Sequence, residues 1–381
     1  MARITPEHQK ALEEIGAIKG EIKKFIFGAD RTIDNMLLGF FSRVPYDDGR
    51  KKRLGCAHAL VMSPPGYGKT GSARILANAI SGKYAFIAGH PEMKVGEIVG
   101  FDMYHQATGD FFFVKGPIFS NIVITDEINR IHPKAQAFNL QAMEERMVVV
   151  NSINSRLRKI DNVTYRLTPI SDDPNDERLV YWNIATGNPF EQEGTYTIPE
   201  AQLDRFSIFF SINLPDREEE MRIRLENVYG DDKNRPEVQV VMDLARAIEI
   251  ADMTIKVKMG HAASNQIMRL IENSRPNGVY EDKNTGELAY SKREFATPQL
   301  RQYVDAYVKA GLSPRANFHF EAVAKTYAFM RGRDYVSLDD IKYVARLVMT
   351  HRVLLRREAR ARGIKQHHVV EEVLKNTALA L

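Results

Sequence analysis

The chain has 381 residues, of which 44% are hydrophobic and 27% charged, and its formal net charge is +4. This composition is that of an ordinary globular protein, and the length predicts roughly two or three domains. No apolar run approaches the ~18 residues that span a bilayer, and the charged N-terminus does not resemble a signal-peptide core. We therefore expect no membrane insertion and a cytoplasmic location. A single cysteine, Cys56, excludes an internal disulfide and is expected to be a small buried residue.

The first half of the chain alternates helical and strand patterns. A Thr5-Pro6 start signal predicts a helix over residues 7–27, and a second helix is expected over 31–42. Short apolar runs of the buried-strand type follow, most of them succeeded by a helical pattern, at 60–63, 84–88, 122–125, 181–186 and 208–212. This alternation favours a parallel sheet covered by helices, an α/β fold.

Beyond Pro215 the pattern becomes helical, and we place a domain boundary there, between residues 1–215 and 216–381. Helices are predicted over 216–228, 236–251, 259–274, 298–310, 314–331 and 338–357. Thr297-Pro298, Ser313-Pro314 and the capping box from Ser337 to Asp340 act as start signals. Residues 277–293, rich in Gly, Asn and charge, are expected to form a loop or a small hairpin.

Residues 59–70 predict a phosphate-binding loop. They read ALVMSPPGYGKT, an apolar strand that runs into a Gly/Pro turn and ends in Gly-Lys-Thr. In such loops backbone N–H groups face the phosphates, the Lys reaches the β and γ oxygens, and the next hydroxyl binds Mg²⁺. Ser63 replaces the first Gly of the pattern, and its effect on affinity stays open. We predict an ATP and Mg²⁺ site formed by Gly66, Tyr67, Gly68, Lys69, Thr70 and Gly71, with Thr70 as a metal ligand.

Two adjacent carboxylates follow another predicted strand, in the segment NIVITDEINR. Downstream of a phosphate-binding loop, Asp126 is expected to bind the Mg²⁺ hydration shell and Glu127 to polarise an attacking water. The pair therefore predicts ATP hydrolysis to ADP and phosphate. The simpler alternative is a pair of acids at a helix N-terminus.

A polar amide follows the strand at 181–186. Asn188 is placed to hydrogen-bond the γ-phosphate or the attacking water, because ligands collect at the carboxyl ends of parallel strands. An ordinary turn before Pro189 is the alternative interpretation.

Five ordered blocks then carry a family resemblance, from about Gly28 to Leu355. They are GPIFSNIVITDEINR, KAQAFNLQAMEER, ATGNPFEQEGTYTIPEAQLDRF, GLSPRANFHFEAVAKTYAFMRGRDYVSLDDI and the final His351-Arg352. Together they resemble the MoxR family of AAA+ ATPases, of the helix 2 insert clade. The resemblance implies a three-layer αβα P-loop NTPase core, followed by an all-helical AAA+ lid. It also implies assembly into a homo-oligomeric ring, usually a hexamer, whose subunits share active sites.

The resemblance also implies residue roles. Asn188 is similar to the sensor 1 residue, Arg205 to the arginine finger and Arg315 to sensor 2, so all three join Glu127 as expected catalytic residues. A guanidinium stabilises charge on a transferring phosphoryl group, which fits the two arginines. Phe27 and Gly28 resemble the segment that lines the adenine.

Two segments are expected to form the working surface. Residues 96–117 contain a Gly109-Asp110 turn between apolar stretches, predicting a β-hairpin at the position of the helix 2 insert. Residues 147–181 resemble the hairpin before sensor 1. Met103, Tyr104 and 111–113 are candidates to grip a polypeptide, although such aromatic runs are often core.

The C-terminal segment is rich in cations. Its basic residues most simply form a solvated helix face, while an acidic partner or nucleic acid stays open as a ligand: Arg352, Arg356, Arg357, Arg360, Arg362 and Lys365.

The leading functional prediction is an ATP-driven ring that remodels or matures a client protein or complex. By resemblance, a protein with a von Willebrand factor A domain is its expected partner. A nucleic-acid translocase is the first alternative. The near-neutral charge and the few cations in 96–117 disfavour it, whereas the segment 156–166 contains several cations. A nucleotide-gated scaffold that works by assembling is the second.

Overall fold

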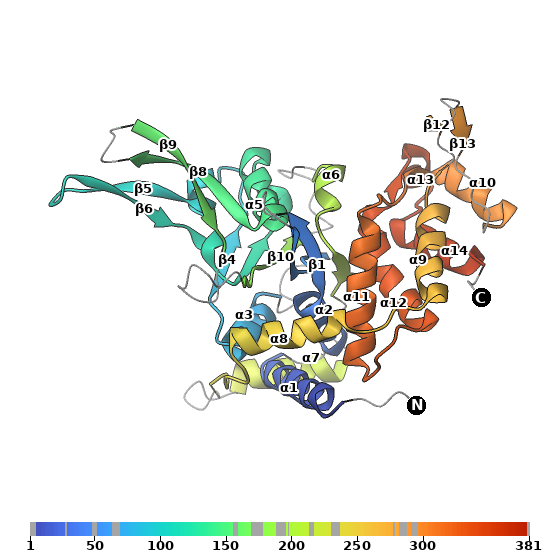
Figure 1. Cartoon of the computed structure of the whole chain (residues 1–381), viewed down its shortest axis with the longest axis horizontal. Helices are drawn as coiled ribbons and strands as arrows, with labels where there is room; N and C mark the ends of the chain where they lie inside the picture. Colours follow the sequence, from blue (N-terminus) through green and yellow to red (C-terminus); the bar gives the residue numbers. More distant parts are fainter. Residues whose placement is uncertain are drawn as a thin grey trace. The chain divides into compact units, whose positions relative to one another are not determined.

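The computed structural model divides the chain into two compact units (Figure 1). We call the described residues of Thr5–Ile198 and Phe210–Asp252 the sheet unit, and those of Pro199–Phe209 and Met253–Leu381 the helical unit. The structure describes residues 5–26, 29–47, 52–62, 69–154, 159–168, 178–187, 196, 198–212, 217–229, 237–276, 279–281, 288–290 and 296–378.

A five-stranded sheet has the order β11-β3-β10-β7-β4, and all of its strands except the first half of β11 belong to the sheet unit. β3 pairs with β10, β10 with β7 and β7 with β4, all in parallel. Buried residues fill β10 and all but the last position of β7, as expected for central strands covered on both faces. The five predicted strands are all confirmed: β3 (Ala59–Met62), β4 (Tyr84–Ala88), β7 (Ile122–Asp126), β10 (Trp182–Gly187) and β11 (Ile208–Ser211).

Helices surround this sheet in the same unit. The first, α1 (Pro6–Lys23), begins where predicted, because the Thr5 side chain accepts a hydrogen bond from the His8 backbone N–H at 3.1 Å. Its buried residues recur every three or four positions and form one apolar face. The others are α2 (Asp30–Phe41), α3 (Lys69–Ala79), α4 (Val95–Val99), α5 (Pro133–Glu145), α7 (Arg217–Tyr229) and most of α8 (Leu244–Ile255).

Three antiparallel hairpins complete the sheet unit. β1 (Arg43–Asp47) pairs with β2 (Lys52–Cys56). The hairpin predicted in 96–117 is confirmed as β5 (Gly100–His105) and β6 (Asp110–Lys115), and 147–181 contains β8 (Met147–Asn154) and β9 (Lys159–Arg166). The β5–β6 and β8–β9 hairpins extend side by side away from the sheet (Figure 1).

The helical unit carries the start signals read from the sequence. Thr297 caps its helix by accepting from the Leu300 N–H at 3.2 Å, and Ser337 and Asp340 form a reciprocal capping box. Its main helices are α6 (Glu200–Leu203), α9 (His261–Asn273), α10 (Pro298–Tyr307), α11 (Ala316–Met330), α12 (Leu338–Met349), α13 (Arg357–Ala361) and α14 (Gln366–Asn376). The small hairpin expected in 277–293 is present as β12 (Val279–Glu281) and β13 (Leu288–Tyr290).

Two predicted helices of the helical unit end earlier than expected. The segment 298–310 leaves the helix at Tyr307, and 338–357 leaves it at Met349. The physical reason is a pairing with no local signal: β14 (Val308–Ala310) forms an antiparallel ladder with β15 (Leu354–Leu355).

The two units also differ from the division predicted at Pro215. Pro199–Phe209 groups with the helical unit, whereas 210–252 groups with the sheet unit. Among the described residues, no helix has both the length and the apolar character needed to cross a membrane.

Candidate functional site

The predicted phosphate-binding loop lies only partly within the described residues. Lys69 and Thr70 are the first two residues of α3, directly after the loop that follows β3. Gly71 follows them in the first turn, where an added Cβ would lie 3.2 Å from Ile26 Cδ1. Outside the described residues lie five of the predicted site residues: Phe27, Gly28, Gly66, Tyr67 and Gly68. Asn188 lies outside them too.

The acidic pair stands where the sequence predicts, at the carboxyl end of β7. Thr186, near the end of the neighbouring strand β10, connects to both residues: its Oγ1 accepts from the Glu127 N–H at 3.2 Å and donates to Asp126 Oδ1. One hydroxyl therefore holds the carboxylate of Asp126 and the backbone of Glu127. Sequence reasoning missed Thr186, because a threonine at a strand end carries no distinctive signal.

Glu127 adopts a left-handed backbone conformation, with φ of +50°. Such a conformation is uncommon outside glycine and recurs at functional sites. Gly89 faces it from the end of β4, and its N–H donates to the Asp126 carbonyl at 2.8 Å. A Cβ at Gly89 would lie 2.4 Å from the Glu127 oxygen, so only glycine fits beside this turn.

The Glu127 carboxylate makes an ion pair. Its Oε2 accepts from Arg130 Nη1 at 2.9 Å, and both side chains are partly exposed. A partly exposed pair three residues apart is weak, worth a few tenths of a kcal/mol. Glu127 is therefore restrained loosely enough to turn toward another partner.

Behind the acidic pair lies a buried polar network. Asn139 Nδ2 donates to Thr125 Oγ1 at 3.0 Å, and Asn183 Nδ2 contacts Asn139 Oδ1 at 3.0 Å. His58 Nδ1 accepts from the Asn183 N–H at 2.9 Å. Buried polar groups of this kind stabilise one arrangement when they are paired, so the network ties α5, β7 and β10 together behind the site.

The donor set suits magnesium and ATP better than a protein-only metal cage. Among the described residues, no group of three His, Cys, Asp or Glu side chains could hold a metal ion. Mg²⁺ is commonly held by one or two protein oxygens together with substrate phosphates and water. A single oriented carboxylate, Asp126, fits that requirement.

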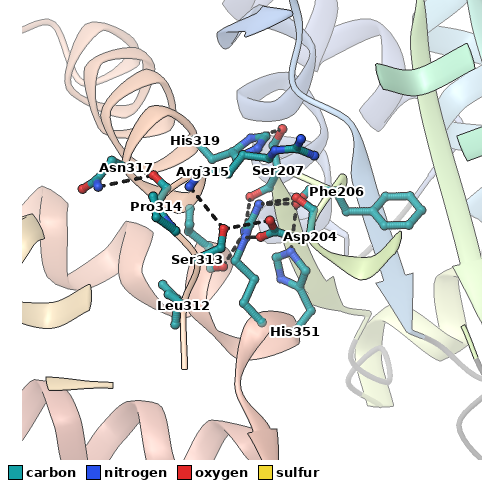
Figure 2. Close-up of polar contacts among 12 residues, drawn as sticks. Asp204, Phe206, Ser207, Leu312, Ser313, Pro314, Arg315, Asn317, His319 and His351 are labelled. Atoms are coloured by element: carbon teal, nitrogen blue, oxygen red, sulfur yellow. Dashed lines mark hydrogen bonds and ion pairs between the residues drawn. The ribbon is translucent and has the colours of Figure 1, made fainter. Parts of the chain in front are cut away.

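In the helical unit, Asp204, Phe206 and Ser207 lie in a cluster of polar contacts (Figure 2). Arg352 donates hydrogen bonds to all three of these residues. Nε donates to Asp204 Oδ1 at 2.9 Å, Nη2 to the Asp204 and Phe206 carbonyls at 3.2 and 2.6 Å, and Nη1 to the Ser207 and Val348 carbonyls at 3.2 and 2.6 Å. A guanidinium has five N–H donors, so every one has an acceptor. The side chain is 1% exposed, and its burial lowers the pKa of Arg352 to about 10, which leaves it charged at neutral pH.

The expectation that Arg352 belongs to a solvated basic face is therefore wrong. The other cations of that stretch are exposed, as expected: Arg356, Arg357, Arg360, Arg362 and Lys365. Arg352 differs because it lies in the 3₁₀ turn η4 (Thr350–Arg352), after α12 has ended, and packs against residues 204–207.

Two histidines hold the same segment. His351 Nε2 donates to the Phe206 carbonyl at 2.9 Å, and His319 Nδ1 contacts Ser207 Oγ at 2.8 Å. Desolvation on burial, reinforced by the neighbouring Arg352, lowers the pKa of His351 well below its usual value. The ring is therefore neutral at pH 7, with its proton on Nε2 because a carbonyl only accepts.

The predicted arginine finger, Arg205, and the predicted sensor 2 residue, Arg315, lie beside this cluster. Arg205 follows Asp204 directly, and the other Asp204 oxygen accepts from Ser313 Oγ at 2.8 Å. Ser313 Oγ in turn accepts from the Arg315 N–H at 3.2 Å (Figure 2). The N-cap position of α11 is Arg315, which makes no side-chain capping hydrogen bond, and not Ser313 as the sequence suggests. Asp204, the residue before Arg205, is thus linked through Ser313 to the backbone of Arg315.

The β5–β6 hairpin exposes apolar side chains on both faces. Directly opposite residues share a face, so Met103 and Phe112 lie on one side and Tyr104 and Phe111 on the other. Met103 is 45% exposed and Tyr104 52%. Phe113 differs, because it is half-buried and stacks on Tyr165 of β9 at 5.0 Å between ring centroids.

Comparisons with known proteins agree with this geometry. The model of the ATPase family associated with various cellular activities (AAA) matches residues 58–175 and 162–208, and that of the AAA lid domain matches 300–373. YeaC from Bacillus subtilis is 32% identical over 84% of this chain and 85% of its own length. Chaperone MoxR1 from Mycobacterium tuberculosis is 28% identical over 94% of this chain and 80% of its own. A crystal structure from Cytophaga hutchinsonii superposes with a TM-score of 0.78 at 28% identity, covering 98% of this chain and 97% of that one.

Proposed function

This chain belongs to the MoxR family of AAA+ ATPases, and from that premise we propose that it hydrolyses ATP in order to remodel or mature a client protein or complex. The arrangement that carries the proposal is the end of β7. There Asp126 and Glu127 follow a buried strand that is separated from the phosphate-binding strand β3 only by β10. Ligands of parallel α/β sheets collect at this edge.

We assign the nucleotide to the loop between β3 and α3. Gly66, Tyr67, Gly68, Lys69, Thr70 and Gly71 would bind the phosphates, with Phe27 and Gly28 near the base. Thr70 and Asp126 would hold Mg²⁺. When bound, the ion neutralises charge on the phosphates.

The hydrolytic step is assigned to Glu127, which would orient and polarise the attacking water. Its weak ion pair with Arg130 allows the carboxylate to turn. Thr186 keeps the Asp126 carboxylate and the Glu127 backbone in a defined arrangement, which supports placing both roles on this pair. Asn188 would contact the γ-phosphate or the water.

The two arginines connect ATP hydrolysis to assembly of the subunits. We assign Arg205 as an arginine finger that a neighbouring subunit supplies to the nucleotide, so hydrolysis depends on a homo-oligomeric ring, with a hexamer as the expected size. Arg315 would link nucleotide state to the lid. A guanidinium supplied in trans is worth roughly 10³–10⁵ in kcat in phosphoryl transfer.

We assign the client and the partner from the MoxR family resemblance and from the exposed surface of the β5–β6 hairpin. We place the helix 2 insert at 96–117 and the hairpin before sensor 1 at 147–181, and retain 1–215 and 216–381 as the core and lid. The exposed apolar faces of β5–β6 suit an extended or partly unfolded polypeptide. Within β5–β6, Lys115 is the one Lys or Arg, against Asp102 and Asp110, which disfavours nucleic acid. A protein with a von Willebrand factor A domain is the proposed partner.

Steady-state ATP turnover tests the proposal. Lys69→Ala and Glu127→Gln should each abolish turnover, while Glu127→Gln should still bind nucleotide. Unchanged hydrolysis in Glu127→Gln would overturn the assignment of the site. If that variant also kept its biological function, the scaffold alternative would replace the remodelling machine.

A further inference from the structure

The segment that carries Arg205 is held by several side chains of the helical unit, and Phe206 and Ser207 in it are buried. Arg205 follows α6, and its neighbours Asp204, Phe206 and Ser207 all bind side chains of the helical unit. The partners come from the turn after α12 and from α11, more than a hundred residues away along the chain. Such contacts restrain the backbone on both sides of Arg205.

We propose that Asp204 and Arg352 are positioning residues that set the backbone of Arg205 so that its guanidinium reaches the neighbouring subunit's nucleotide. This inference rests on the proposed role of Arg205 as an arginine finger. Neither positioning residue is assigned a contact with the nucleotide. They act through the turn that presents Arg205.

The donor count explains why this position needs an arginine. Arg352 uses all five N–H donors, three of them on main-chain carbonyls of the Arg205 segment. A lysine offers three donors from a single point and cannot span the same acceptors. Arg352→Lys therefore keeps the charge but loses at least two of the five contacts.

The Asp204 carboxylate is held on both oxygens. Oδ1 accepts from Arg352 Nε at 2.9 Å and Oδ2 accepts from Ser313 Oγ at 2.8 Å. A carboxylate anchored on two sides cannot rotate freely, so the residue directly before Arg205 is fixed through its side chain and its carbonyl. His351 reinforces the next anchor, because the Phe206 carbonyl accepts from both His351 and Arg352.

Loss of the contacts between Arg352 and the segment 204–207 should lower ATP turnover and leave ATP binding unchanged. An arginine finger contacts charge that develops in the transition state, so misplacing it lowers kcat and leaves KM nearly unchanged. A displacement of about 1 Å in a catalytic group can cost roughly 10²-fold. We expect Arg352→Lys to lower kcat by about 10- to 100-fold, with KM for ATP within about twofold of the wild-type value.

Mixed rings separate positioning from a structural defect. Subunits with Glu127→Gln cannot hydrolyse but present an intact Arg205. In mixed rings, an Arg352→Lys subunit keeps an active site that can hydrolyse ATP. Where its neighbour is a Glu127→Gln subunit, that neighbour supplies a correctly placed Arg205 to this active site. Turnover per Arg352→Lys subunit should therefore rise several-fold above that of the pure variant, as it should for Arg205→Ala mixed in the same way.

The controls make each outcome decisive. Arg346→Lys alters an exposed ion pair between α12 and Glu371 of α14 and should leave kcat unchanged. Wild-type kcat in Arg352→Lys, or a loss that mixing does not rescue while Arg205→Ala is rescued, would overturn the inference. An unaffected Arg205→Ala would instead overturn the proposed function and the inference with it. If Arg352→Lys rings do not assemble, Asp204→Asn replaces that variant, because it keeps the shape of the side chain. It is mixed with Glu127→Gln subunits in the same way, and the same results support or overturn the inference.

Discussion

The carboxylates after β7 and the carboxylate of Asp204 are held in different ways. Glu127 has a left-handed backbone conformation and pairs with a partly exposed Arg130. Asp126 accepts a hydrogen bond from the neutral hydroxyl of Thr186. Asp204 faces a 1%-exposed guanidinium whose donors are all used. The first arrangement leaves a carboxylate free to change partners, whereas the second resists movement. The difference separates a group that must react from a group that must stay in place.

The largest expected effect is on the buried pair. Arg352→Met removes the cation and leaves Asp204 largely buried without its partner, which should lower the free energy of unfolding by about 3 kcal/mol. Urea titrations would measure this by circular dichroism, while fluorescence of the single Trp182, fully buried in the sheet, reports the sheet unit.

The matched control for that experiment is Arg346→Met, which breaks an exposed ion pair and should cost less than about 1 kcal/mol. Equal shifts in the two variants would contradict the contrast between buried and exposed pairs.

A smaller effect is expected at the end of β10. Thr186→Val keeps the shape but deprives Asp126 and the Glu127 N–H of their shared partner. Unfolding should become easier by about 1–2 kcal/mol, and ATP turnover should fall roughly tenfold as the acidic pair loses its orientation. Thr164→Val, on the exposed side of β9, is the control and should change neither. Full turnover in Thr186→Val would show that the hydroxyl does not orient the pair.

The buried His351 predicts a pH dependence of stability. Its folded-state pKa is depressed, so the folded protein stays unprotonated where the unfolded chain binds a proton. Stability is therefore lost as pH falls below about 6.5, by up to about 1.4 kcal/mol per pH unit, until the folded pKa is reached. The free energies of unfolding of the wild type and His351→Gln, compared at pH 7.5 and 5.5, measure this pH dependence. The advantage of the wild type should shrink at the lower pH, and a constant difference would contradict a neutral buried ring.

The smallest effect is expected for Arg130→Gln, which removes the partly exposed partner of Glu127. Stability should change by less than about 0.5 kcal/mol in urea titrations, in contrast to Arg352→Met. A loss of several kcal/mol would show that the Glu127 pair is as tightly held as the Asp204 pair.

Local sequence patterns were sufficient where the structure depends on local chemistry. Continuous apolar runs located the five strands, and the Thr297 and Ser337 caps located two helix starts. The acidic pair was found at the end of β7 because a buried strand followed by Asp126-Glu127 is a local feature.

Long-range pairing was not visible in the same way. Arg352 lies 148 residues from Asp204, within a basic stretch whose other cations are exposed. The composition of that stretch therefore predicted an exposed Arg352 side chain. The early end of α12 depends on a ladder between β14 and β15, and no nearby Gly or Pro marks it. His351-Arg352 contributed to the family resemblance, but only the structure shows what these side chains contact.

Light scattering measures the mass of the purified protein in solution without nucleotide, with ADP and with a non-hydrolysable ATP analogue, and so shows whether the subunits assemble into a ring with shared active sites. A shared active site predicts growth to a closed oligomer with the ATP analogue, and loss of that growth in Arg205→Ala. A monomer under all three conditions would leave Arg205 without a neighbouring nucleotide and would contradict the account of a ring ATPase.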